Sequence, residues 1–201
     1  MKTLPTEASP ETIREQVRER YGAIAAKPGG SCCSTAKSCC GSGSPDALAS
    51  TLGYAEGDLA AIPQGANLGL SCGNPTALAS LSPGEVLLDL GSGAGFDAFL
   101  AGPKVGSTGR VIGVDMTPDM ITRARRNLET YTKRTGLDNI EFRLGEIEHL
   151  PVSDAMIDVI ISNCVINLSP DKPQVWRDMF RVLKPGGRVA VSDLALVQAL
   201  P

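Results

Sequence analysis

The chain of 201 residues is 42% hydrophobic and 20% charged, and its formal net charge at neutral pH is −3. This apolar content is enough to build a buried core, so a chain that is disordered throughout is excluded. The small negative charge disfavours attraction to nucleic acid or to an anionic membrane, and we expect neither as a partner.

The first ten residues have neither the basic start nor the apolar stretch of a secretory signal, and no run in the sequence is long enough to cross a bilayer. A cytoplasmic location is therefore expected. In that compartment the six cysteines are expected to be mostly reduced. We interpret them as packing, ligand or redox residues rather than as a disulfide framework.

An N-terminal helix followed by a flexible Cys-rich loop is predicted for residues 1–45. Ser9 and Pro10 have the character of an N-cap and a first helical residue. Apolar side chains then recur at helical spacing, at Ile13, Val17, Tyr21 and Ile24. From residue 27 onward glycine, serine and cysteine dominate without periodicity, which favours a flexible loop.

The loop carries two adjacent cysteine pairs, Cys32/Cys33 and Cys39/Cys40. Zinc binding is one interpretation of these four thiols, but the Cys-x-x-Cys spacing is absent and no histidine is near. A redox or metalloid-relay loop is the favoured interpretation, and a plain spacer is the remaining alternative.

Residues 46–201 are predicted to form one α/β domain. Short helical patches precede an alternation of apolar runs and amphipathic segments. The expected strands are Val86 to Leu90, Arg110 to Asp115, Ile140 to Leu144, Val159 to Ser162 and Arg188 to Ser192. Helices are expected from about Phe96, after Thr117 and around Trp176. This order predicts a Rossmann-like, mostly parallel sheet with helices on both faces and a ligand crevice at the carboxyl ends of the strands.

A glycine-rich loop follows the first predicted strand. It is Asp89-Leu90-Gly91-Ser92-Gly93-Ala94-Gly95, and Asp115 ends the next strand 20 positions beyond the last glycine. Small residues let the backbone approach a ligand, and a carboxylate at that distance can hold ribose hydroxyls. Phe96 stands where a dinucleotide fingerprint has its third glycine, so NAD is disfavoured and another nucleoside is expected.

The loop and its surroundings resemble those of class I S-adenosylmethionine-dependent methyltransferases. The resemblance includes Gly145-Glu146, where that class places an acidic residue near adenine, and the run from Leu183 to Gly187. It implies that S-adenosylmethionine is bound by Asp89, Gly91, Gly93, Gly95, Asp115, Met116, Glu146 and Asn163. A tight turn, a capping carboxylate and a solvated glutamate are the alternative interpretations of these residues.

Cysteines are the candidates for binding the methyl acceptor. His149, the single histidine, is interpreted as a solvated loop residue. An acceptor with its own lone pair needs no general base, only positioning. Cys164 directly follows the fourth predicted strand, and Cys72 lies 92 positions earlier in a turn-rich stretch. Thiolates are soft ligands for a thiophilic metalloid, whereas the alternative is that Cys164 is a small core residue and Cys72 a chance loop cysteine.

Four segments resemble the signatures of the arsenite methyltransferase family, namely Asn67 to Pro75, Leu88 to Asp97, Gly113 to Met120 and Ser162 to Lys172. The resemblance implies that Cys72 and Cys164 bind As(III), whose lone pair attacks the methyl group of S-adenosylmethionine in arsenic detoxification. It also implies that one cysteine of the N-terminal loop, in the Cys32/Cys33 or the Cys39/Cys40 pair, forms a redox pair with Cys72 that is reset by thioredoxin or glutathione, and Cys33 is the catalytic candidate among them. Arsenite or its thiol conjugates are the implied small-molecule substrate, and a monomer is expected.

Two other functions stay open from the sequence. One is a methyltransferase for another small molecule, as in quinone or sterol biosynthesis, and the other is a non-catalytic thiol protein that binds metalloids. Family members also continue past the fifth strand and supply a third arsenic-binding cysteine. Residues 194–201 provide neither feature, so the sequence is either a fragment or a natural two-thiol variant on a shortened sheet. A shortened sheet would leave the fifth strand as an exposed edge, and we therefore expect a fragment.

Overall fold

A computed structural model of the chain describes residues 9–26 and 44–195. Most of the predicted loop, with Cys33 and the other three loop cysteines, lies outside the described residues. The elements are α1 (Pro10–Ala25), α2 (Pro45–Thr51), α3 (Glu56–Ala61), α4 (Pro75–Leu78), β1 (Val86–Leu90), α5 (Phe96–Val105), β2 (Arg110–Asp115), α6 (Pro118–Thr135), β3 (Ile140–Leu144), β4 (Ile157–Asn163), η1 (Ile166–Leu168), α7 (Lys172–Val182) and β5 (Leu183–Ser192). The division of the chain at residue 45 stays a prediction.

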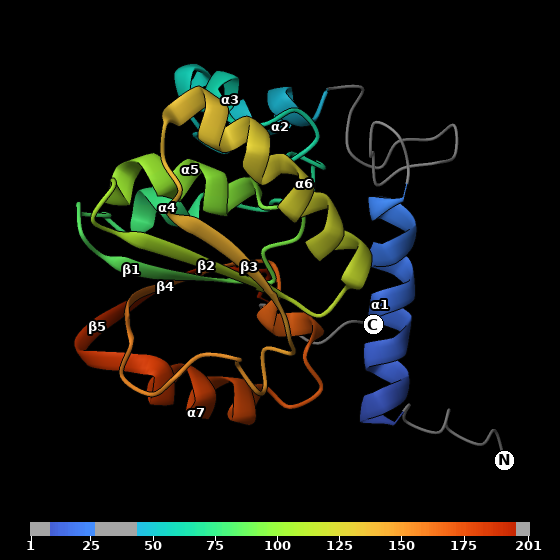
Figure 1. Cartoon of the computed structure of the whole chain (residues 1–201). Helices are drawn as coiled ribbons and strands as arrows, with labels where there is room; N and C mark the ends of the chain where they lie inside the picture. Colours follow the sequence, from blue (N-terminus) through green and yellow to red (C-terminus); the bar gives the residue numbers. More distant parts are fainter. Residues whose placement is uncertain (1–8, 27–43, 196–201) are drawn as a thin grey trace, which may run out of the picture.

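The described strands form one parallel sheet in the order β3-β2-β1-β4-β5. Helices α5 and α6 cover one face and α7 covers the other, so the predicted Rossmann-like architecture is confirmed (Figure 1). Strand β1 is apolar on both sides because both faces are covered. Leu87 packs on the α5 side with Phe99, and Leu88 packs on the α7 side with Met179.

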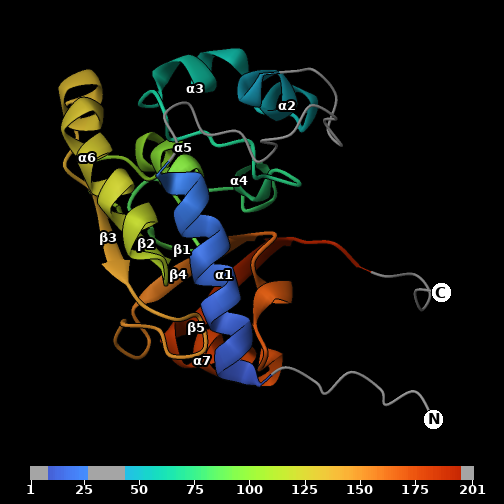
Figure 2. The same ribbon diagram turned by 90° about the vertical axis from the view of Figure 1, so that its right-hand side faces the viewer.

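The N-terminal helix α1 begins as its sequence predicts. The side chain of Ser9 accepts a hydrogen bond from the backbone N–H of Thr12 at 3.2 Å, and Pro10 is the first helical residue. The helix packs against α6 and stands beside the ends of β1, β2 and β4, as Figure 2 shows. Its apolar face therefore closes one side of the sheet edge.

The last strand begins earlier than the sequence predicts. The expected start was Arg188, but β5 starts at Leu183 and includes the turn-like run before Gly187. Leu183 pairs with Ile157, and the pairing with β4 shifts register before it resumes at Arg188. An irregularity of this kind keeps a strand paired through glycine and proline, residues that by themselves predict a break.

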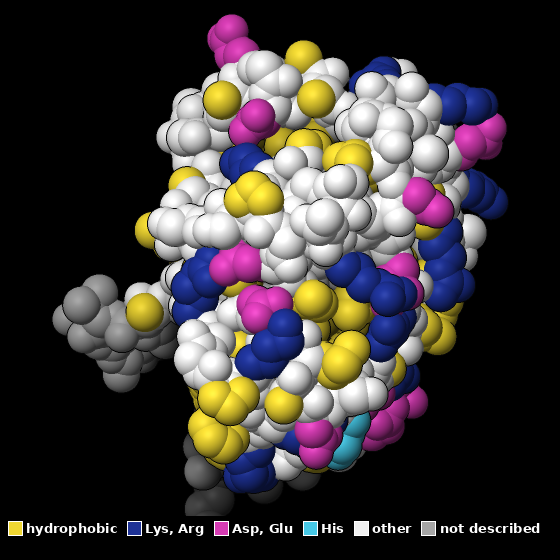
Figure 3. Space-filling model, turned by 60° about the vertical axis from the view of Figure 1, so that its left-hand side comes forward, with side chains coloured by type: hydrophobic (Ala, Val, Ile, Leu, Met, Phe, Trp, Pro, Cys, Tyr) yellow, Lys and Arg dark blue, Asp and Glu magenta, His cyan; other side chains and the backbone are white. Residues whose placement is uncertain are grey.

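The surface mixes charge and apolar side chains. Acidic and basic groups alternate over the face shown in Figure 3, with apolar side chains scattered between them. None of the helices in the described part of the chain combines the length and the apolar character needed to cross a membrane.

Strand order reverses between β1 and β4, because the chain moves outward through β2 and β3 before it returns beside β1. Loops that leave the two strands there diverge to opposite faces and leave a crevice at their carboxyl ends. The structure thus puts the glycine loop after β1 next to the cysteine segment after β4.

Candidate active site

A cavity opens at this crevice and, with its mouth, encloses about 1020 Å³ of empty space. Its walls come from parts of the chain that are far apart in sequence. They include Arg14, Val17 and Tyr21 of α1, Asp89 of β1, Gly91 and Gly93 of the glycine loop, Asp115 and Met116 after β2, and Asn163 and Cys164 after β4. The cavity therefore joins the predicted cofactor residues, with the exception of Gly95 and Glu146, to one of the predicted arsenic ligands.

Glycine is required at the three positions of the loop for different physical reasons. All three have positive φ, at 63° for Gly91, 53° for Gly93 and 93° for Gly95. A Cβ on Gly91 would lie 2.4 Å from Val165, and one on Gly95 would lie 2.6 Å from Phe99. A Cβ on Gly93 would meet no atom closer than 4.0 Å. Two glycines thus allow close packing, while the third leaves the backbone open to a ligand.

The carboxylate of Asp115 is held in place by the backbone around it. Its Oδ2 accepts the N–H of Gly93 at 2.9 Å, and its Oδ1 accepts the N–H of Thr117 at 2.8 Å. Burial raises the pKa of Asp115, and these two hydrogen bonds oppose the rise. The arrangement places a fixed carboxylate at the end of β2, where ribose hydroxyls can donate to its remaining lone pairs.

Asp89 is buried in the cavity wall with an unsatisfied oxygen. Its side chain is 3% exposed, and its Oδ2 has no hydrogen-bond partner among the described residues. Burial, followed by the charges of Asp97 and Asp115, raises the pKa of Asp89 well above its usual range. An unsatisfied buried acceptor is costly, so this oxygen suits a cationic N–H donor. S-adenosylmethionine, with an ammonium group, a sulfonium and ribose hydroxyls, matches these groups.

Glu146, predicted to lie near adenine, is held by the N-terminal helix. Its Oε1 is 2.9 Å from Nη2 of Arg18, and its Oε2 is 3.4 Å from Nε of Arg14. It is not among the described residues that line the cavity, whereas Glu148 is. A contact of Glu146 with the cofactor stays a prediction.

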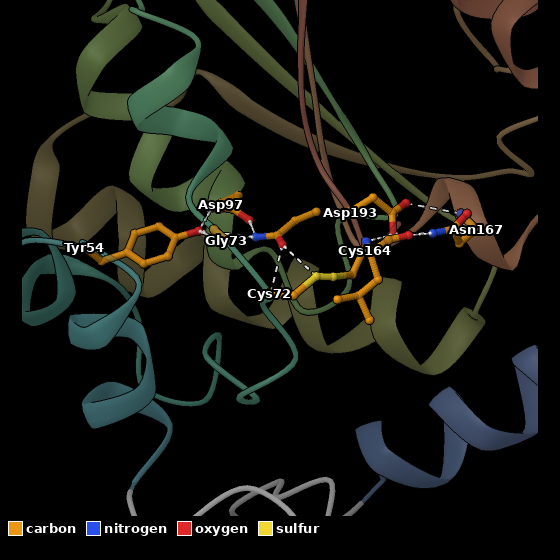
Figure 4. Close-up of a disulfide and its surroundings, with 9 residues drawn as sticks. Tyr54, Cys72, Gly73, Asp97, Cys164, Asn167 and Asp193 are labelled. Carbon is orange, nitrogen blue, oxygen red and sulfur yellow. Dashed lines mark hydrogen bonds between the residues drawn. A yellow bond between two sulfur atoms is a disulfide. The ribbon is translucent and has the colours of Figure 1, made fainter. Parts of the chain in front are cut away.

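Cys72 and Cys164 are brought together by the fold and joined in a disulfide, with 6.2 Å between their Cα atoms (Figure 4). This differs from the expectation that the cysteines are reduced. The Cα separation is within the range that a disulfide requires, because the end of β4 meets the segment before α4. The described partner of Cys72 is Cys164, while the predicted partners, Cys33 and the other three loop cysteines, lie outside the described residues.

Cys164 has an unusual backbone. Its φ is 58°, in the left-handed region, and its N–H donates to the carbonyl of Ser192 at 2.8 Å. Such a conformation is uncommon for a residue with a Cβ and concentrates at functional sites. The end of β5 thus fixes the cysteine, and a Cβ on Gly73, next to Cys72, would lie 1.8 Å from Oγ of Ser192. Both cysteine segments therefore contact Ser192 at the end of β5.

Asn163, predicted to bind the cofactor, lines the cavity but has its amide turned to the Cys72 segment. Its Oδ1 accepts the N–H of Cys72 at 3.1 Å, and its Nδ2 donates to the carbonyl of Gly73 and to Oδ2 of Asp97, both at 3.0 Å. Tyr54 donates to the other oxygen of Asp97 at 2.7 Å. Burial, followed by the charge of Asp97, raises the pKa of Tyr54.

Sequence reasoning missed Tyr54 and Asp97 as part of the site. Asp97 stands in the first turn of α5, where an acidic residue is common for the helix dipole alone, and Tyr54 is 43 positions earlier in a region of short helices. Only the position of Asp97 next to the glycine loop offered a signal. His149, by contrast, is exposed as predicted.

The described residues contain no group of three or more His, Cys, Asp or Glu side chains that could hold a metal ion. The cavity itself offers four acidic side chains (Asp89, Asp97, Asp115 and Glu148), the open backbone of the glycine loop and Cys164, which is bonded to Cys72.

A parallel sheet in this order, with a glycine loop after β1 and a carboxylate after β2, is the fold of class I S-adenosylmethionine-dependent methyltransferases. The chain belongs to the methyltransferase-domain family, whose model, described as "Methyltransferase domain", matches residues 81–201.

Individual relatives are more specific. The chain is 50% identical to an arsenite methyltransferase of Halobacterium salinarum, over 100% of this chain and 52% of the relative. An arsenite methyltransferase of Aquipseudomonas alcaligenes is 47% identical over 57% of this chain and 34% of its own length. The crystal structure of an arsenic(III) S-adenosylmethionine methyltransferase from Chlamydomonas reinhardtii matches with a TM-score of 0.62 and 38% identity, over 77% of this chain and 51% of that one. The chain thus spans about half or less of the length of these relatives.

Proposed function

We propose that the chain is an arsenite methyltransferase, which transfers a methyl group from S-adenosylmethionine to thiol-bound As(III) in arsenic detoxification. The observation that carries the proposal is the pairing of Cys72 with Cys164, which lines the cofactor cavity. The names of the full-length relatives agree with it. A thiophilic metalloid held by both sulfurs lies next to the space that suits the cofactor.

The thiol pair acts in its reduced form. A dithiol or two glutathione molecules reduce the Cys72–Cys164 disulfide, and the reductant is oxidised to its own disulfide. Each protein thiol then replaces a hydroxyl group of arsenous acid, so two As–S bonds form and two water molecules leave. Thioredoxin or glutathione is the proposed reductant, and a cysteine of the N-terminal loop, Cys33 or one of the other three, remains the predicted redox partner in later steps.

The chain's own residues bind and orient the cofactor. Asp89 accepts from its ammonium group, Asp115 accepts from its ribose hydroxyls, and the open backbone at Gly93 lets it approach closely. When bound, S-adenosylmethionine supplies a methyl group that is activated by the sulfonium. The four acidic side chains of the cavity favour that positive charge. Because arsenic has its own lone pair, no general base is needed, which agrees with the exposed position of His149.

Arsenic speciation is the experiment that tests this function. The purified chain is incubated with arsenite, S-adenosylmethionine and a thiol reductant, and methylated arsenic is measured by chromatography with mass detection. We expect methylated product from the unmodified chain and none from Cys72→Ser or Cys164→Ser. Binding of S-adenosylmethionine, titrated in parallel, is expected to persist in both variants. Full activity of both serine variants, or activity indifferent to arsenite, contradicts the proposal.

A further inference from the structure

Asn163 has a set of contacts that a cofactor ligand does not need. Its amide meets four protein partners in the described structure, at Cys72, Gly73, Asp97 and, at 3.3 Å from its Nδ2, the phenol oxygen of Tyr54. The acceptor oxygen faces the one backbone N–H, and the donor nitrogen faces a carbonyl and a carboxylate. A flipped amide would put a donor against a donor and an acceptor against two acceptors, so these partners fix its orientation.

The contacts hold the thiol of Cys72 beside that of Cys164. Asn163 directly precedes Cys164 in the chain, while its side chain binds the backbone on either side of the Cys72–Gly73 peptide. Its Oδ1 also lies 3.8 Å from Sγ of Cys72. One residue at the end of β4 thus sets the distance between two segments that are 92 positions apart.

Asp97 and Tyr54 support this amide from behind. Tyr54 is 5% exposed and Asp97 is 6% exposed, and the phenol oxygen also lies 2.9 Å from the carbonyl oxygen of Gly73, which shares the single O–H donor of Tyr54 with Asp97. The ring of Tyr54 packs edge-on against Phe96, at 4.9 Å between centroids. A buried network in which each polar group has its hydrogen-bond partners is rigid, and the removal of one member lowers the stability of the folded state. Figure 4 shows these side chains in line from Tyr54 to the sulfurs.

We propose that Asn163 is a positioning residue that holds Cys72 next to Cys164, supported by Asp97 and Tyr54, and that it is not a ligand of the cofactor. The inference rests on the proposed function for the use of the thiol pair in arsenite capture. Asparagine suits this position because aspartate would face the carbonyl of Gly73 and the carboxylate of Asp97 with a third acceptor.

The dithiol–disulfide equilibrium of Cys72 and Cys164 tests the proposal without arsenic or methyl transfer. The full chain is equilibrated in glutathione buffers, and the state of the pair is measured by alkylation and mass spectrometry of the Cys72 and Cys164 peptides. Asn163→Leu keeps the volume but removes the hydrogen bonds. We expect it to shift the equilibrium about tenfold toward the dithiol, because the two thiols lose effective concentration.

Matched variants separate positioning from general damage. Tyr54→Phe, which removes only the phenol oxygen, is expected to give a smaller shift in the same direction. Asn167→Ser is the control, since Asn167 lies on the same segment but its side chain donates to Asp193. We expect no shift for it. Affinity for S-adenosylmethionine is expected to stay unchanged in all three variants. The KM for arsenite is expected to rise most in Asn163→Leu.

An unchanged equilibrium in both Asn163→Leu and Tyr54→Phe overturns the proposal, and so does a loss of cofactor affinity with the equilibrium intact. If Asn163→Leu does not fold, Tyr54→Phe decides between the two outcomes. Absence of arsenic methylation by the unmodified chain contradicts the proposed function but leaves this equilibrium as a test of the positioning role.

Discussion

Glycine at three alternate positions of the cofactor loop serves two purposes at the scale of single residues. Gly95 is required by packing, since its Cβ would collide with Phe99, whereas the face of Gly93 is free. Sequence alone could not separate these roles, because both glycines have the same spacing in the same motif. Only the positions of the surrounding side chains distinguish a packing glycine from a ligand-facing one.

The two glycines are expected to respond differently to alanine. Gly95→Ala combines a strained φ with overpacking and should lower the free energy of unfolding by about 3 kcal/mol. Gly93→Ala should cost only about 1 kcal/mol of stability, from the left-handed φ, but should weaken S-adenosylmethionine binding strongly. Urea unfolding and a cofactor titration on both variants check this. Equal loss of stability in the two would contradict the assignment.

Two buried carboxylates make opposite contributions to stability. Burial alone would raise the pKa of Asp178, but Arg181 and the N–H of Leu150, at 2.6 Å, hold it below its ordinary value. Its stabilisation is present at neutral pH and is lost only as the pH falls below the unfolded value of about 3.9. The pKa of Asp89 is raised, so its buried charge destabilises the cofactor-free protein at neutral pH, and that cost disappears on acidification toward the same value.

Substitution by asparagine is expected to show the difference. Asp89→Asn should stabilise the cofactor-free protein at pH 7 by about 1 kcal/mol, should flatten the rise in stability between pH 7 and pH 5, and should weaken cofactor binding. Asp178→Asn should destabilise it by about 1–3 kcal/mol at both pH values. Unfolding by urea at the two pH values provides the measurement. If Asp89→Asn is less stable than the unmodified chain at pH 7, the buried charge of Asp89 does not destabilise the cofactor-free protein.

Among the elements, α1 connects the two halves of the cofactor site. Its apolar residues Val17 and Tyr21 line the cavity, and Arg14 is 3.4 Å from Glu146 and 3.5 Å from Glu148. Glu148 has a side chain that is only 4% exposed, so this contact is screened less than a surface ion pair. The ion pairs therefore hold the helix over the mouth of the cavity.

Arg14→Met is expected to loosen α1 without unfolding the sheet. Amide hydrogen exchange in α1 should become faster, and the affinity for S-adenosylmethionine should fall about three- to tenfold. Arg20→Met, at an exposed position of the same helix, is the matched control and should change neither quantity. If both variants behave alike, the ion pairs of Arg14 do not hold the helix.

Sequence patterns predicted the elements well where the periodicity was long and buried. Strand β1 and helix α6 begin where apolar spacing and capping residues predict them, at Val86 and Pro118. The predicted start of β5 was wrong because glycine and proline also occur within an irregular strand. The network behind Cys72 could not be predicted, since Tyr54 and Asp97 meet only through the packing of α5 against the loop between α2 and α3.

For the whole molecule, the cofactor is expected to act as a stabiliser. A ligand that binds only the folded state adds about 2.7 kcal/mol at one hundred times its Kd, which for a chain of this size corresponds to a rise in Tm of roughly 5–10 °C. Thermal unfolding with S-adenosylmethionine is the measurement, and NAD is the control that should have no effect. A response to NAD alone would contradict the class of cofactor assigned here.

Both cysteine segments contact Ser192 at the end of β5. This contact links metalloid capture to the order in which the chain is synthesised. During translation Cys72 leaves the ribosome long before Cys164, and both precede the strand end that fixes them. A nascent chain that lacks this strand end therefore does not hold the two thiols in their native, preorganised arrangement. Preorganised two-point binding of a thiophilic poison at Cys72 and Cys164 is thus confined to molecules in which the sheet has been completed as far as β5.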